Sequence, residues 1–135
     1  MSNIATYLEE AVIDWCFEGA DMDTSPGNVY LALHSADPTN DGSENEVTAS
    51  DYDRISTSPT DWVRATTGGP TTIENSSELS FGETTSNWGT VSHVSVWDDS
   101  SDGNCLWQGA LDVSKTVDQG DELIFRVGDI SVSLE

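Results

Sequence analysis

Two histidines, His34 and His93, are the side chains best suited to act as a base near neutral pH. Either could accept a proton from a serine or cysteine nucleophile, or bind a metal together with carboxylates. Both lie in the middle of predicted strands, and no serine or cysteine stands in a recognisable nucleophile-elbow motif. Carboxylates occur throughout the chain, so their presence nearby is weak evidence for a metal site. We therefore expect structural histidines, no enzyme activity, and no catalytic residue, cofactor or resident metal.

Two acidic loops partly resemble calcium-binding loops. Their sequences are Asp37-x-Thr39-x-Asp41-Gly42 and Asp98-x-Ser100-x-Asp102-Gly103, with oxygen-bearing side chains at alternate positions before a glycine. An EF-hand loop also requires a glutamate at its twelfth position and a helix on each side. Those positions hold Thr48 and Gly109, and the flanking segments resemble strands. The sequence therefore predicts acidic turns that bind cations only loosely.

Tryptophan and cysteine offer two further kinds of site. Aromatic faces can stack on sugars, but clustered tryptophans more often fill a core or an interface between subunits. The five candidates are Trp15, Trp62, Trp88, Trp97 and Trp107.

Cys16 and Cys105 lack metal-ligand spacing, so buried free thiols are the simpler interpretation. A disulfide between them cannot be derived from the sequence.

The net charge indicates the kind of solvent in which this protein is stable. The chain of 135 residues carries 25 acidic and four basic side chains, a formal charge of −21. Self-repulsion destabilises such a surface in dilute buffer, whereas 1 M salt shortens the screening length to about 3 Å. This composition, with Lys115 as its single lysine, is typical of a halophilic protein. Nucleic acid is not expected as a partner, because binding its phosphates requires clustered lysine and arginine.

The length and the hydropathy pattern predict one soluble domain over residues 1–135. The start of the chain lacks a basic region followed by an apolar run, so we expect no secretory signal. No apolar stretch approaches the roughly 20 residues that a membrane span requires. We therefore expect a protein made in the cytoplasm, without a membrane partner.

The hydrophobic periodicity predicts one helix followed by many strands. Residues 3–18 show an amphipathic helical stripe, and this helix is expected to pack on the domain or to dock on a neighbour. After Gly19 the apolar period changes from 3.6 to 2 residues. The predicted strands are 29–34, 52–56, 62–66, 71–74, 79–81, 91–97, 104–113, 123–127 and 130–134. This pattern predicts a mainly β fold, an antiparallel, jelly-roll-like β-sandwich with one N-terminal amphipathic helix.

Several motifs occur in the order typical of a family of small tailed-virus proteins. The segment 30–39 reads YLALHSADPT, and Gly42, Glu46-Val47 and Tyr52-x-Arg54 follow it. Members of this family typically contain "YLALHTADP…G…EVSG…YAR". The resemblance extends over roughly residues 28–134 through the later segments 79–84, 88–93, 106–111, 115–117, 120–121 and 128–132. Such proteins are commonly labelled tail fibre or minor tail proteins, so the resemblance implies a virion structural component without catalytic residues.

These observations predict a virion structural protein of a tailed virus that infects a halophilic archaeon. We favour a capsid decoration or turret component on the particle exterior, because elongated fibres usually need repeats or coiled-coil heptads. The alternatives are a tail fibre or baseplate protein and a glycan-binding module for host adsorption. The expected partners are other virion proteins and further copies of the same chain, with a host surface glycan under the last alternative. The expected location is the virion, after assembly in the host cytoplasm.

Overall fold

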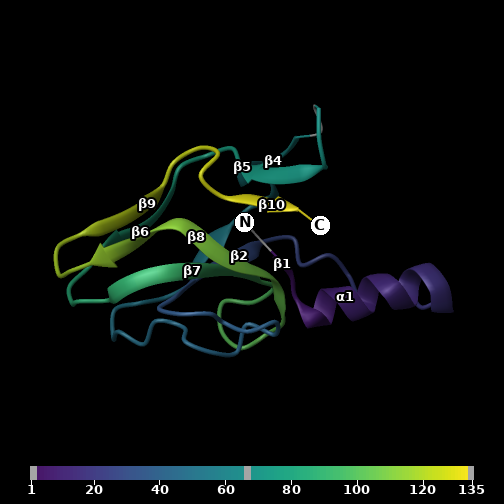
Figure 1. Ribbon diagram of the computed structural model, residues 1–135, viewed down its shortest axis with the longest axis horizontal. Helices are drawn as coiled ribbons and strands as arrows, with labels where there is room; N and C mark the ends of the chain where they lie inside the picture. The colour runs from purple at the N-terminus through teal and green to yellow at the C-terminus, as the bar shows by residue number, and fades with distance from the viewer. Residues whose placement is uncertain (1–2, 66–67, 134–135) are drawn as a thin grey trace.

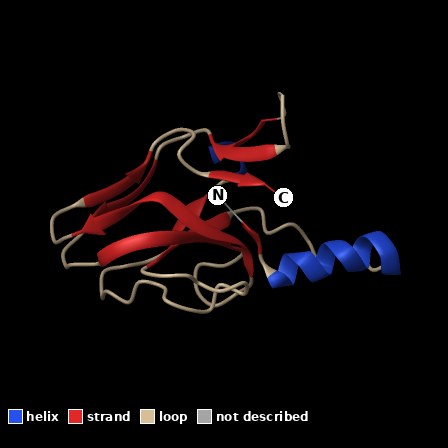
Figure 2. Cartoon of the chain, viewed as in Figure 1, coloured by secondary structure: helices blue, strands red, loops and turns tan. Residues whose placement is uncertain are grey.

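The computed structural model describes residues 3–65 and 68–133, and these residues are mainly β (Figure 1). The strands are β1 (Asn3–Ile4), β2 (Val29–His34), β3 (Ile55–Thr57), β4 (Trp62–Ala65), β5 (Thr72–Asn75), β6 (Leu79–Glu83), β7 (Gly89–Trp97), β8 (Cys105–Val117), β9 (Glu122–Phe125) and β10 (Ser131–Ser133). The helical segments are α1 (Thr6–Ile13), η1 (Asp14–Glu18) and η2 (Pro59–Asp61). The predicted antiparallel β-sandwich with an N-terminal helix is confirmed (Figure 2).

The larger sheet has the strand order β1-β8-β7-β2-β3, and neighbouring strands are antiparallel. Side chains alternate between the two faces of each strand. Leu31 and Leu33 of β2 therefore share one face with Val96 of β7, which lies opposite Leu31 in the register. Ala32 and His34 point to the other face, which the loop between β2 and β3 covers. Both faces of β2 are thus buried at its centre.

Two small sheets form the second layer over the core face of the large sheet (Figure 1). One has the order β10-β5-β4, and the other pairs β6 with β9. Phe125 of β9 is 2% exposed, and burial of such a side chain stabilises the fold by about 1.5–3 kcal/mol. The main core consists of Leu31, Leu33, Val47, Leu79, Trp88, Val91, Val96, Val117, Leu123, Phe125, Ile130 and Val132.

The N-terminal segment differs from the predicted helix over residues 3–18. Asn3 and Ile4 pair with Gln108 and Trp107 of β8, so the chain begins as a short strand and α1 starts only at Thr6. The helix then continues as a π-helical turn, η1, which ends at Gly19 in the left-handed conformation (φ 71°). Of the two expectations for this helix, close packing on the domain is met only in part, because α1 lies beside β8 but α1 and η1 contain no buried residue, and docking on a neighbour stays a prediction. The helical segment projects from the body of the molecule (Figure 1).

The nine predicted strands all occur in the predicted order, as β2 to β10, and their errors lie at the boundaries, whereas β1 was not predicted. The second predicted strand, 52–56, is observed only from Ile55 to Thr57, because Tyr52 and Arg54 point their side chains into a polar network. The strand predicted at 104–113 extends to Val117, paired along β7 across a bulge. Residues 66 and 134, which two predicted strands include, lie outside the described residues. Among the described residues, no helix has the length and apolar character needed to span a membrane.

Candidate functional site

A buried hydrogen-bonded chain on the loop-covered face of the large sheet contains one of the two predicted base candidates. The Trp97 indole N–H donates to the Ser95 hydroxyl at 2.6 Å, and Ser95 Oγ lies 2.7 Å from His34 Nε2. His34 Nδ1 lies 2.8 Å from the Glu44 carbonyl oxygen. A carbonyl only accepts, so Nδ1 carries the proton and Nε2 accepts the Ser95 hydroxyl proton. Every polar atom of this imidazole is therefore used within the fold.

The Ser95–His34 pair has the hydrogen bond of a nucleophile and its base, but no substrate can reach it. Both residues are 0% exposed, and the segment that includes Glu44 lies over them. Burial is the main cause that lowers the pKa of His34, which favours the neutral imidazole. The arrangement fixes the β2–β7 pair and the covering loop.

The structure brings the two histidines together, which the sequence did not predict. His34 and His93 face each other in the register of β2 and β7. His93 is half-buried, with its Nδ1 at 2.8 Å from the Ser92 hydroxyl. In the part of the chain that the structure describes, no group of three His, Cys, Asp or Glu side chains could hold a metal. To predict this pair, one would need the antiparallel register of the strands at 29–34 and 91–97, which places residue 34 opposite residue 93.

The buried His34 makes a pH dependence of stability predictable. Its pKa is lowered on folding, so the unfolded chain binds more protons, and stability is lost as the pH falls below about 6.5. We expect His34→Gln to make the unfolding free energy less dependent on pH between about pH 7 and pH 5, where one group contributes at most about 1.4 kcal/mol per pH unit. Urea unfolding in concentrated KCl measures this slope, and His93→Gln is the control. Identical slopes for wild type and His34→Gln would contradict the prediction.

The motif residues Glu46, Tyr52 and Arg54 form a second polar network beside the first. The Arg54 guanidinium donates two bonds of 2.9 Å to the two carboxylate oxygens of Glu46. The Tyr52 hydroxyl donates to Glu46 at 2.8 Å and accepts from the backbone N–H of Leu33 at 3.0 Å. Burial raises the pKa of Glu46, but the bonds from Arg54 and Tyr52 outweigh it and lower the pKa overall. This network joins the covering loop to the edge of β2.

Arg54 also connects this network to the loop between β7 and β8. Its guanidinium carbon lies 3.9 Å from the centroid of the Trp97 ring, a cation–π contact. It donates to the carbonyl oxygens of Asp99 at 3.2 Å and Asp102 at 2.9 Å. One arginine therefore holds the second acidic loop and Glu46, which follows the first acidic loop, together over Trp97.

The carboxylates of the two acidic loops are engaged in turn hydrogen bonds. Asp41 accepts from the Thr39 hydroxyl at 2.7 Å and from the Ser43 hydroxyl and N–H at 2.8 and 3.1 Å. These bonds lower the pKa of Asp41 to about 2. Asp98 accepts from the backbone N–H of Asn104 at 2.7 Å in the same way. The prediction of acidic turns agrees with this geometry, and loose cation binding stays a prediction.

The two cysteines have different environments. Cys105 is buried, and its burial raises the pKa of the thiol to about 12. Its side chain packs against Gly42, where an added Cβ would lie only 2.6 Å from the Cys105 sulfur and 2.9 Å from the Trp97 ring. Cys16 is exposed on η1, so the expectation that both thiols are buried is wrong for Cys16. Both thiols are free.

The five tryptophans do not form one exposed platform. Trp88 and Trp97 are buried, with their indole N–H groups on Asp51 at 2.8 Å and Ser95 at 2.6 Å. Trp62 and Trp107 are half-buried and donate to Thr57 and to the Ser133 carbonyl. Trp15 is 57% exposed on the projecting helix. The preference for a core or interface role therefore holds for the four that lie in the sandwich.

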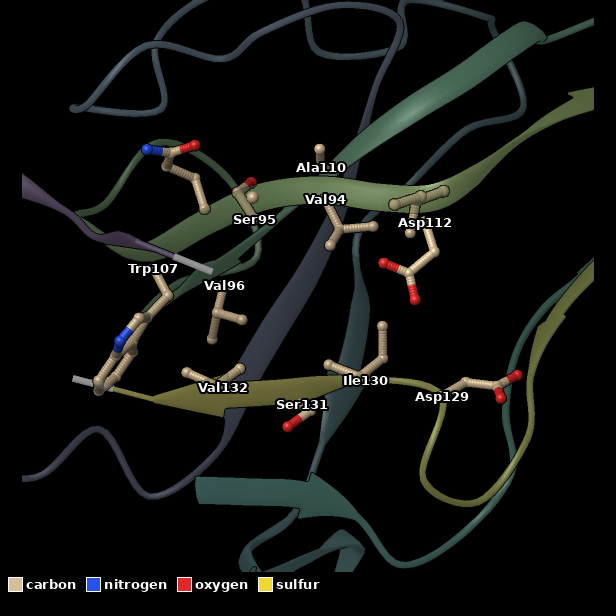
Figure 3. Close-up of a pocket in the computed structure, with 13 residues that line it drawn as sticks. Val94, Ser95, Val96, Trp107, Ala110, Asp112, Asp129, Ile130, Ser131 and Val132 are labelled. Carbon is tan, nitrogen blue, oxygen red and sulfur yellow. The ribbon is translucent and has the colours of Figure 1, made fainter. Parts of the chain in front are cut away.

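A narrow crevice separates the large sheet from β10 (Figure 3). Val94 and Val96 point toward Ile130 and Val132 across it, and Trp107 closes one end. Its volume is about 60 Å³, whereas pockets for small molecules span roughly 300–1,000 Å³. Among the described residues, every buried side-chain nitrogen and oxygen has a hydrogen-bond partner. The crevice therefore offers neither the volume nor a free buried polar group for an organic ligand.

Comparison with known protein families identifies a likeness over nearly the whole chain. The family described as "Podophage GP4 fiber I protein gp80" matches residues 3–133. The match includes both polar networks, both acidic loops and the projecting helix. No curated protein matches the chain.

Proposed function

Because the chain belongs to the podophage GP4 fiber I protein (gp80) family, we propose that it is a non-enzymatic, fibre-associated component of the tail of a virus that infects a halophilic archaeon. Membership of this family makes it a phage-type structural protein of the virion. The position on the tail, the host and the lack of activity are the parts that we propose. The observation that carries the proposal is the packing of Glu46, Tyr52 and Arg54. These motif residues bond to one another and to neighbouring loops, so they stabilise the fold and are not free to act in a reaction.

A non-catalytic role is supported by how the candidate bases are used. His34 and Ser95 are fully buried, and the His34 ring nitrogens are engaged by Ser95 and by the Glu44 carbonyl. A catalytic base must lie within hydrogen-bond reach of its substrate. Hydrolysis assays in concentrated salt, with peptide, ester and glycoside substrates, test this part, and turnover that His34→Gln abolishes would overturn it.

A halophilic host is supported by the charge of −21, and it makes a prediction about salt. Concentrated KCl screens the repulsion between carboxylates, so we expect the melting temperature to rise steadily from dilute buffer to molar KCl. Thermal unfolding followed by tryptophan fluorescence measures the effect. An uncharged osmolyte at equal osmolality is the control, because it stabilises without screening charge. A melting temperature that is flat or falls with KCl would contradict a halophilic origin.

The position on the tail is tested by cryo-electron microscopy of intact virions in high salt. Density for this fold in a few copies around the tail axis is the expected result. Density that repeats over the shell with icosahedral symmetry would overturn the tail position.

That second outcome would support the other candidate, a capsid decoration or turret component. The compact single sandwich favours it, because the described chain has no repeated unit and its projecting helix is short. A glycan-binding role remains a prediction. Trp88 is buried and cannot serve as the platform, whereas Trp107 is half-buried and lines a surface pocket with Ile73 and Val132. Self-association also remains a prediction, and light scattering of the purified chain tests it.

A further inference from the structure

The helical segment formed by α1 and η1 contains no buried residue, and its outer end is mostly exposed. It leaves the body of the molecule beside β1 and projects outward (Figure 1). Its first turn is attached through Asn40, whose side-chain amide donates to the Thr6 hydroxyl at 2.7 Å and whose carbonyl accepts from the Thr6 N–H at 3.1 Å. The rest of α1 lies beside β8 with Leu8, Ala11 and Val12 half-buried, whereas Ile13 and residues 15–18 are exposed. Helices of this length are marginal on their own in water and take most of their stability from packing. The outer end of the segment therefore lacks the packing that would normally stabilise a helix.

The outer part of this segment is apolar on two opposite sides. Ile13 and Phe17 are four residues apart and share one side, with exposed fractions of 56% and 84%. Trp15 lies two residues from each of them, on the opposite side, and is 57% exposed. A helix that is apolar around most of its circumference is normally enclosed rather than packed on one face. We refer to residues 12–18 as the helix tip.

Acidic side chains occupy the remaining edge of the helix tip. Asp14 and Glu18 are four residues apart and lie together between the two apolar sides. No lysine or arginine precedes Arg54 in the chain, so nothing within the helix balances them. We propose that the helix tip inserts into an apolar socket of a different virion protein, and that lysine or arginine side chains line the rim of this socket beside Asp14 and Glu18. This inference rests on the proposed role in the virion.

Charge complementarity selects a different protein over a second copy of this chain. A second copy carries the same charge of −21 and has only four basic side chains, of which Arg54 is already bound to Glu46 and two loop carbonyls. It therefore has few basic side chains that could pair with Asp14 and Glu18. An anionic membrane surface is disfavoured for the same reason, since helices that bind such surfaces carry lysine and arginine on their polar face.

Cys16 provides a direct probe, because it is exposed in the middle of the helix tip while Cys105 is buried. We would treat the purified chain and intact virions with N-ethylmaleimide in the same concentrated KCl buffer, and then quantify modification of both cysteines by mass spectrometry. The expected result is rapid modification of Cys16 in the isolated chain and loss of that modification in virions, with Cys105 unmodified in both. Equal modification of Cys16 in both samples would overturn the proposal. Protection of Cys16 in a purified chain that is dimeric by light scattering would also overturn it, in favour of a second copy.

Incorporation into virions then tests the chemistry of the socket. We expect Ile13→Ser with Phe17→Ser, and separately Asp14→Lys with Glu18→Lys, to lose incorporation, while melting temperatures show that the sandwich stays folded. Val113→Ser with Val127→Ser is the matched control, because it removes two apolar side chains of 70% and 64% exposure outside the helix and should incorporate normally. Normal incorporation of both helix variants would overturn the socket. Absence of the wild-type chain from purified virions would instead overturn the proposed function, so the two failures are distinguishable.

Discussion

Replacing Gly42 by alanine is expected to lower the free energy of unfolding by about 3–4 kcal/mol. Gly42 is buried in the left-handed conformation, with φ 74°, at the end of the first acidic loop. An added Cβ would lie 2.6 Å from the Cys105 sulfur, 2.8 Å from its Cβ and 2.9 Å from the Trp97 ring. The substitution therefore combines backbone strain of about 1–2 kcal/mol with overpacking of about 1–3 kcal/mol. Urea unfolding in concentrated KCl measures the change.

Gly27 supplies the matched control for this prediction. It has the same φ of 74°, but a Cβ added there would meet nothing within 4 Å. Gly27→Ala should therefore cost only the backbone strain, about 1–2 kcal/mol. Equal losses for the two variants would mean that the contacts with Cys105 and Trp97 contribute nothing, and the packing argument for Gly42 would then be wrong.

Replacing Arg54 by methionine is expected to cost about 3 kcal/mol, the second large effect. The change leaves the Glu46 carboxylate, whose side chain is 27% exposed, without its 2.9 Å ion pair to the Arg54 side chain, which is 7% exposed. It also removes the cation–π contact with Trp97 and the bonds to the carbonyls of Asp99 and Asp102. The loop between β7 and β8 should consequently become more accessible to proteolysis. Unfolding in urea and limited proteolysis in concentrated KCl measure the two consequences.

Three further variants separate charge from geometry at this position. Arg54→Lys keeps the charge but loses the paired bonds to Glu46, so an intermediate loss of stability is expected. Adding Glu46→Gln to Arg54→Met should recover part of the loss, because the unpaired carboxylate is then neutral. Arg126→Met removes the same charge from an exposed residue and should change stability by no more than about 0.5 kcal/mol. A loss for Arg54→Met as small as that of Arg126→Met would refute a stabilising role of the network.

The two predictions together explain why one motif can identify a structural family. Gly42, Glu46, Tyr52 and Arg54 lie in a loop with little regular structure, which on its own would have many conformations. Their side chains, or the lack of one at Gly42, fix this loop against Trp97 and the edge of β2. The motif therefore specifies a fold, and the surfaces that contact other virion proteins lie elsewhere, as we propose for the helix tip.

The strands were predictable from the sequence because their signal is local. Val29–His34 and Gly89–Trp97 are short runs rich in apolar, β-branched and aromatic residues, bounded by glycine and aspartate turns, and such runs are typical of strands even where both faces are buried. The turns were predictable for a similar reason, since residues such as Asp98 bond to backbone groups a few positions away. Boundaries were less certain, because Tyr52 and Arg54 have strand-like propensity but their contacts with Glu46 are not local.

The sequence by itself determined the β-sandwich, the acidic character and the likeness to tailed-virus structural proteins, because composition, periodicity and motif order are properties of the chain. Only the tertiary structure decided where the chemistry-bearing side chains lie. It placed His34 opposite His93 and buried it against Ser95, and it placed Arg54 over Trp97, between Glu46 and the second acidic loop. It also left the helix tip without a buried residue. An amphipathic stripe in a sequence indicates that a helix packs against something, but it does not indicate whether the partner is the same chain or another protein.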